Sequence, residues 1–193
     1  MRLHRFMTTI TDTHPAYVAG TWKLDPTHSA LSFSLKHLMI STVRGTFDTF
    51  DVTVVTAENP THSSVSATVE IASVNTQNAD RDAHLRNGDF FSADEFPQMT
   101  FTSTSAVLTG DDFSVAGELT LKGVTKSVTL KGEFGGIVVD GYGQTKAGAS
   151  LSTTIDRTDY GVMFNMPLEA GGVALGHDVK ISIELQLVLQ PAA

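Results

Sequence analysis

The sequence predicts an all-β protein built as an antiparallel, eight-stranded barrel with one short helix. Two observations support this fold class. Apolar and polar residues alternate with a period of two along most of the chain, as they do in strands that bury one face. Turn signals rich in glycine, asparagine, aspartate and proline separate these segments at short intervals, which is typical of a meander of antiparallel strands.

The stretch over residues 22–50 contains the strand on which the barrel prediction depends. Asp25 and Pro26 break the chain before this strand, since proline restricts its predecessor and donates no backbone hydrogen bond. Ser32, Ser34 and Lys36 share the polar face of the strand. The opposite face, which points inward if the sheet closes, carries Leu31, Phe33, Leu35 and His37.

The alternation continues over residues 51–56 and 62–73 and then stops. Residues 78–88 contain no β-branched side chain. Asn78 can cap the N-terminus of a helix, Asp80 and Asp82 suit the positive end of the helix dipole, and Gly88 can end the helix. We therefore expect a short helix over residues 80–87. The phenylalanine-rich loop over residues 89–97 is expected to pack onto the end of the barrel.

Five further strands are expected in the second half of the chain, over residues 99–108, 113–121, 127–134, 145–155 and 178–190. A turn is predicted at 123–126, a mobile or bulged connection at 135–136 and 141–143, and an irregular segment over 162–176. Closing the meander into a barrel removes exposed strand edges. A two-sheet sandwich would show the same alternation, so the pattern leaves that alternative open.

The size and charge of the chain limit its organisation and its partners. A chain of 193 residues suggests one domain, assigned to residues 20–193 after a flexible leader at 1–19. The formal net charge of -8 argues against nucleic acid or anionic lipid surfaces as main partners. The chain has no cysteine, which excludes disulfides and thiol catalysis. No signal peptide or membrane span is apparent, so we expect a cytoplasmic protein without stable membrane insertion.

Several short pieces of the sequence, in order along the domain, resemble the YceI-like family of polyisoprenoid-binding, lipocalin-like proteins. Each piece is weak alone, but their order and spacing make the match specific. They are WKLD at residues 22–25, HS at 28–29, FSLKH at 33–37, RGTF at 44–47, RDAHL at 81–85, DFF at 89–91, FP at 96–97, TFTS at 100–103, GELTLKGVTK at 117–126 and DRTDYG at 156–161.

The resemblance implies a lipocalin-like barrel with a helical lid and a long apolar interior. It also implies binding of an isoprenoid chain or another long-chain amphipathic lipid, with no characterised reaction and no cofactor, and it suggests a homodimer. The alternative is a stress-related interaction protein or a metal-responsive protein without a lipid cargo.

The residues expected to grip a lipid tail favour a filled core when the sequence is taken alone, and the resemblance reverses that preference in favour of a cavity. Burying apolar surface contributes roughly 25 cal/mol per Å², so a long prenyl chain could bind there without any hydrogen bond. The candidate wall residues are Leu31, Phe33, Leu35, Phe47, Leu119, Leu121 and Leu151. His37, on the same face as Leu35, either makes a hydrogen bond in the core or contacts a polar headgroup.

The predicted helix offers a second candidate contact with the ligand. Arg81 and His84, with Arg86, could clamp an anionic or quinone headgroup, whereas the acidic residues among them favour a solvated, salt-bridged face. His28 beside Asp25 is interpreted as part of a turn rather than a catalytic pair. No catalytic triad, nucleophile elbow or recognised histidine metal motif is present, so we expect no enzyme activity. A metal site built from His28, His37 or His177 stays open as an alternative.

Overall fold

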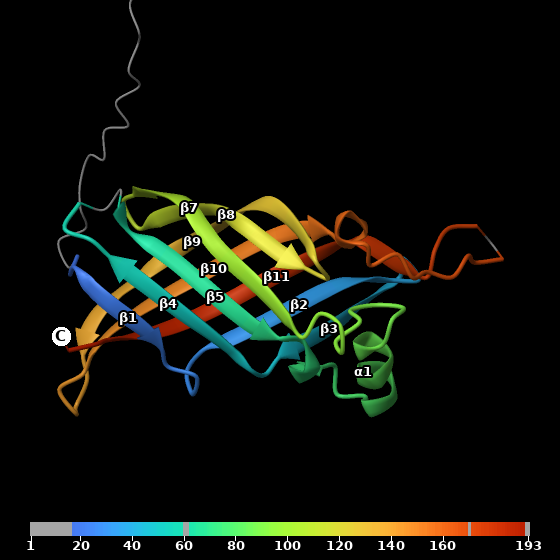
Figure 1. Cartoon of the computed structure of the whole chain (residues 1–193), viewed down its shortest axis with the longest axis horizontal. Helices are drawn as coiled ribbons and strands as arrows, with labels where there is room; N and C mark the ends of the chain where they lie inside the picture. Colours follow the sequence, from blue (N-terminus) through green and yellow to red (C-terminus); the bar gives the residue numbers. More distant parts are fainter. Residues whose placement is uncertain (1–16, 60–61, 170, 192–193) are drawn as a thin grey trace, which may run out of the picture.

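The computed structural model describes residues 17–59, 62–169 and 171–191, which fold into one antiparallel sheet of 11 strands and one α-helix (Figure 1). The strands are β1 (Gly20–Leu24), β2 (Ala30–His37), β3 (Ser41–Phe47), β4 (Phe50–Thr56), β5 (Ser64–Glu70), β6 (Val74–Asn75), β7 (Gln98–Thr109), β8 (Asp112–Leu121), β9 (Val124–Val139), β10 (Thr145–Asp156) and β11 (Leu175–Leu189). The helix is α1 (Ala79–Arg86), and 3-10 turns cover Ile71–Ser73 and Arg157–Tyr160.

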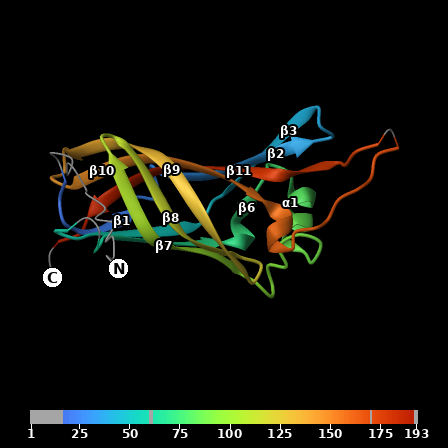
Figure 2. The same ribbon diagram turned by 90° about the horizontal axis from the view of Figure 1, so that it is seen from above.

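Eight of these strands close into a barrel, as predicted, and the sandwich alternative is wrong. The ring runs β1-β4-β5-β7-β8-β9-β10-β11, and β1 pairs back with β11. Closure uses only the end of β11, where Leu187 and Leu189 lie opposite Leu24 and Trp22. The earlier part of β11 pairs with β2, and the sheet continues through β3 and β6. Seen from above, β2 and β3 extend past the ring on the side of α1 (Figure 2).

The chain between β1 and β2 crosses the point where β11 changes its partner. At this point neither β1 nor β2 pairs with Gln186, and its backbone N–H and carbonyl would cost free energy if they stayed unpaired. The backbone N–H of Asp25 donates to the carbonyl of Gln186 at 2.8 Å, and the hydroxyl of Ser29 accepts from the N–H of Gln186 at 2.9 Å. The break predicted at Asp25 and Pro26 therefore lies at the seam of the barrel.

The alternating residues of β11 contribute to two separate apolar clusters. Val179, Ile181 and Ile183 pack against the larger cluster, which surrounds Phe47 and Leu121. Further along the strand, Leu185, Leu187 and Leu189 belong to or pack against the smaller cluster of Trp22, Val52, Ala147 and Leu187. Since alternate strand residues share a face, one regular pattern supplies the interior at both ends of the barrel.

Three local predictions concern the end of β5, the turn between β8 and β9, and the glycine pair in β9. The strand expected over 62–73 ends at Glu70, where a 3-10 turn directs the chain toward β3. The turn expected at 123–126 is shorter, because Lys122 and Gly123 both have positive φ angles (49° and 74°), as in a two-residue hairpin turn. The connection expected at 135–136 lies instead within β9, which runs to Val139, but the bulge is confirmed, since Gly135 is skipped where Gly136 and Phe134 pair with Gly148 and Ala149.

The predicted helix is confirmed within one residue at each end. The side chain of Asn78 accepts a hydrogen bond from the backbone N–H of Arg81 at 2.9 Å, as a capping residue does. The C-terminal cap is Asn87 in an extended conformation, so Gly88 does not end the helix as expected.

Most of the predicted leader lies outside the described residues. Of positions 1–19, only Tyr17, Val18 and Ala19 are described. The hydroxyl of Tyr17 donates to the carbonyl of Ala57 at 2.7 Å. The domain boundary between residues 19 and 20 stays a prediction.

Candidate functional site

A largely apolar cavity lies inside the larger cluster, between the barrel wall and the segment that contains α1. Its volume is about 90 Å³. All lining residues except Ser32 and Arg157 are apolar. The lining consists of Leu31, Ser32, Phe33, Leu35, Phe47, Leu85, Phe90, Phe91, Met99, Leu121, Ile155, Arg157, Val162, Val179 and Ile181.

Phenylalanine rings from three parts of the chain form one side of this cavity. The rings of Phe33 and Phe47 have centroids 5.5 Å apart, and those of Phe47 and Phe91 are 6.0 Å apart, both in tilted geometry. Phe33 lies directly over Gly45 on the neighbouring strand, where an added Cβ would come 2.5 Å from the ring. Glycine at position 45 therefore makes room for the ring that forms the cavity wall.

A buried carboxylate fixes α1 to the segment that follows β6. Asp82 is 8% exposed, and its Oδ1 accepts from the backbone N–H of Thr76 at 2.8 Å and from the Thr76 hydroxyl at 2.6 Å. These hydrogen bonds position Leu85, the only residue of α1 that lines the cavity. We refer to residues 79–96, which cover this end of the barrel, as the lid.

The two predicted headgroup residues of α1 are engaged with other parts of the protein. Arg81 donates from Nε to the hydroxyl of Thr76 at 2.7 Å and from Nη2 to its carbonyl at 2.8 Å. His84 contacts Asp89 through Nε2 at 2.8 Å, and its ring meets those of Phe90 and Phe164 edge-on at 5.0 and 5.1 Å. Neither side chain lines the cavity.

The predicted wall residues divide into two groups. Leu31, Phe33, Leu35, Phe47 and Leu121 line the cavity. Leu119 is buried in the same cluster and Leu151 packs against it, but neither is among the lining residues. His37 is half-buried at the far end of β2, opposite Ser41 and Leu175, and it also lies outside the lining. Their roles in ligand binding stay predictions.

Sequence reasoning missed Arg157, a charged residue in the wall of the cavity. It is 4% exposed, and burial lowers the pKa of its guanidinium below the ordinary value. Its Nε donates to the carbonyl of Gly176 at 2.9 Å, and its Nη1 donates to the carbonyls of Val162 at 2.6 Å and Phe164 at 3.0 Å. The DRTDYG motif at residues 156–161 contains this residue, but it served only as part of the family resemblance.

Two negative findings apply to the described residues alone. Over 17–59, 62–169 and 171–191, none of the helices has the length and apolar character needed to cross a membrane. Across the same ranges, no cluster of three or more histidine, aspartate or glutamate side chains could hold a metal ion.

The sequence and the fold of this chain are similar to those of known proteins. Residues 22–187 match the family model described as the YceI-like domain. A UPF0312 protein of Staphylococcus aureus is 45% identical over 159 residues, which cover 81% of this chain and 90% of the relative. The crystal structure of a YCEI protein from Campylobacter jejuni is 31% identical, with a TM-score of 0.69, and the match covers 81% of this chain and 90% of that one.

A more distant structure shares the fold. A domain from Saccharophagus degradans, described as polyisoprenoid-binding, has a TM-score of 0.67 at 17% identity. The match covers 88% of this chain and 98% of that domain. At this identity the likeness concerns the fold alone.

Proposed function

Because this chain belongs to the YceI-like family, we propose that it binds an isoprenoid or another long-chain amphipathic lipid inside its barrel. The observation that carries the proposal is the cavity at the lid end, whose lining is apolar except for Ser32 and Arg157. The description of the Saccharophagus domain as polyisoprenoid-binding agrees with it, although that domain shares only the fold. The role proposed is binding rather than catalysis.

Apolar burial is sufficient to drive such binding. A lipid tail that buries about 300 Å² gains roughly 7 kcal/mol at about 25 cal/mol per Å². Loss of motional freedom on association offsets at least about 4 kcal/mol of this gain. The balance favours longer chains, because each added carbon contributes burial while most of the association cost is already met.

The size of the cavity indicates that the lid must move during uptake. An apolar cavity of about 150 Å³ in another protein accommodates benzene, so about 90 Å³ is too small for a long chain. The rings of Phe47 and Phe91 meet between the barrel and the lid, and their separation would lengthen the cavity. We therefore expect the tail to lie along Leu31, Phe33, Leu35 and Leu121, and to reach Leu119 and Leu151, which lie outside the present lining, as the interior opens.

The test is native mass spectrometry of the protein purified from its own source, followed by organic extraction. A discrete bound mass that extracts into organic solvent and has a prenyl or long-chain composition is the expected result. A protein that carries no such mass, and that fails to take up added prenyl alcohols and fatty acids, would exclude the lipid-binding role.

A further inference from the structure

The guanidinium of Arg157 is buried at the wall of an apolar cavity without a carboxylate partner. Among the described residues, no aspartate or glutamate oxygen lies within ion-pair distance of it. The adjacent Asp156 instead accepts from the backbone N–H of Thr158 at 2.8 Å and from its hydroxyl at 2.6 Å. The positive charge is therefore offset at hydrogen-bond distance by backbone carbonyls, and at longer range by the charge of Asp156.

The hydrogen bonds of Arg157 leave one nitrogen unused. A guanidinium has five N–H donors, one on Nε and two on each terminal nitrogen. The bonds to Gly176, Val162 and Phe164 occupy Nε and Nη1. Nη2 is the only buried side-chain nitrogen or oxygen of the described residues that has no hydrogen-bond partner.

A buried charge with unused donors is unfavourable unless another group compensates it. Losing the proton does not relieve this cost at neutral pH, because arginine stays protonated in proteins even when burial lowers its pKa. Three carbonyls hold the guanidinium in place through Nε and Nη1, so the unpaired Nη2 is fixed in position as well. Such preorganised donors suit an oxygen that carries negative charge.

We propose that Arg157 binds the headgroup of the lipid through Nη2, and that this headgroup is an oxyanion, a carboxylate or a phosphate, on an apolar chain. The inference rests on the proposed function, since it concerns the same cavity. Within the wall, Arg157 supplies the charge while Leu31, Leu35 and Val179 supply the apolar surface. A neutral headgroup would bring no negative charge to the guanidinium, so the cavity should bind it more weakly than an oxyanion.

The test compares ligands that share a tail and differ in the headgroup. Oleate is paired with oleyl alcohol and farnesyl phosphate with farnesol, each titrated calorimetrically below its aggregation concentration into delipidated full-length protein. Hydrogen bonds to charged groups predict at least about tenfold tighter binding of the anion. Arg157→Met should reduce the anion-to-alcohol affinity ratio to about one, because the group that distinguishes the two headgroups is gone. Preference for the carboxylate or for the phosphate identifies the source of the oxyanion.

Arg157→Lys keeps the test valid if Arg157→Met fails to fold, because lysine retains the charge and loses the planar fork. We expect it to keep part of the discrimination, with circular dichroism confirming the fold. Equal affinity of the wild type for acid and alcohol would overturn the headgroup assignment while the lipid-binding function stands. Unchanged discrimination in folded Arg157→Met would also overturn it. If no ligand of either pair binds, the proposed function itself fails and this inference fails with it.

Discussion

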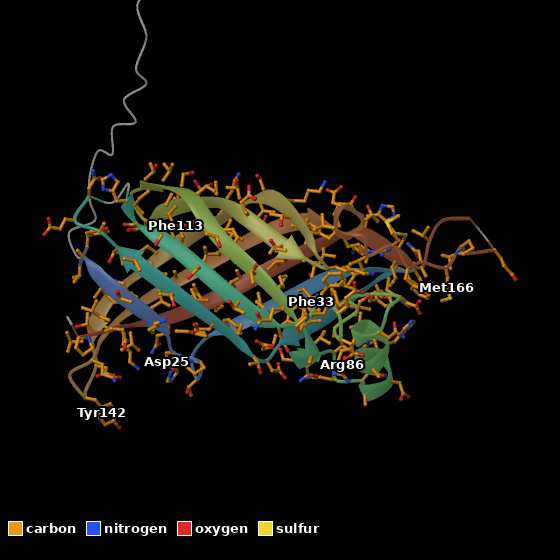
Figure 3. All side chains as sticks on the ribbon, in the orientation of Figure 1. Asp25, Phe33, Arg86, Phe113, Tyr142 and Met166 are labelled. Carbon is orange, nitrogen blue, oxygen red and sulfur yellow. The ribbon has the colours of Figure 1, made fainter. Side chains whose placement is uncertain are left out.

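The Trp22 end and the lid end of the barrel are filled in different ways. At the Trp22 end, one indole is 3% exposed and packs with Val52, Ala147 and Leu187, and its Nε1 donates to the hydroxyl of Thr56 at 2.9 Å. At the lid end, several phenylalanines from separate segments meet around the cavity. In Figure 3, Phe33 lies toward α1, and Asp25 and Tyr142 lie toward the opposite end.

The two ends therefore have different roles: one closes the ring of strands, and the other covers the interior. At the Trp22 end, β1 joins the ring to β4 on one side and β11 on the other. The lid end is covered by elements with fewer connections, such as β6, which pairs with β3 through two residues only. No member of the Trp22 cluster lines the cavity. We infer that the Trp22 end maintains the fold while the lid end admits the ligand.

The largest effect is expected from Trp22→Ala. Removing a buried aromatic side chain costs about 3–5 kcal/mol through lost burial and the cavity left behind. Urea denaturation should show this loss as a lower midpoint with an unchanged slope. Trp22→Phe, the matched control, should cost less because it keeps most of the apolar volume and loses mainly the hydrogen bond to Thr56. A small effect of Trp22→Ala would contradict the role given to this end.

Asp82→Ala is expected to loosen the lid end specifically. It removes a buried carboxylate that accepts two hydrogen bonds from Thr76, at a cost of about 2 kcal/mol. Hydrogen exchange of residues 79–96 should accelerate while exchange in β1 and β10 stays as in the wild type. Asp80→Ala is the control, an exposed position in the same helix. If exchange rose uniformly across the barrel, the lid would not be a separate opening unit.

Enlarging matched valines distinguishes the two ends by packing. Val179→Phe places extra volume beside the cavity, whereas Val54→Phe places it against the Trp22 cluster. Overpacking a filled interior costs about 1–3 kcal/mol, so Val54→Phe should destabilise the protein by that amount. Val179→Phe should cost less than about 1 kcal/mol and weaken lipid binding. Thermal unfolding and a lipid titration report the two effects, and the reverse pattern would refute this comparison.

The sequence identified the faces of the strands better than their partners. Alternation placed Leu31, Phe33 and Leu35 on one inward face, because side-chain direction follows from position along a strand. It could not show that β11 changes partner at Gln186, since pairing between distant segments leaves no local signal. The helix was predictable because Asn78 and the adjacent aspartates act within a single turn.

The candidate site was predictable only where it depends on local pattern. Five of the proposed wall residues line the cavity, since alternation and apolarity were enough to select them. Arg157 was missed because its environment is formed by the carbonyls of residues 162, 164 and 176, in a segment without regular pattern. The hydrogen bonds of Arg81 and His84 were likewise not predictable, because only the folded chain brings Thr76 and Asp89 within bonding distance of them.

The smallest effect is expected from acid titration of Asp25 at the seam. Burial alone would raise the pKa of this carboxyl, but hydrogen bonds from His28, Lys146 and the N–H of Thr27 lower it from 3.8 to about 2. A carboxylate whose pKa is lower in the folded state stabilises the fold above pH 3.8, and this contribution disappears as the pH falls toward 2. With His28 largely exposed, solvent screening limits the contribution to about 1 kcal/mol.

Asp25→Asn isolates this contribution from those of other carboxylates. At pH 7 the variant should unfold at a lower urea concentration than the wild type, and the two midpoints should converge between pH 4 and pH 2 because the wild-type carboxyl becomes neutral. Asp51→Asn, at an exposed position of β4, serves as the control. A difference that stays constant down to pH 2 would mean that the seam does not depend on the charge of Asp25. Since this carboxylate lies at the Trp22 end, lipid affinity measured at pH 7 should stay unchanged in the variant.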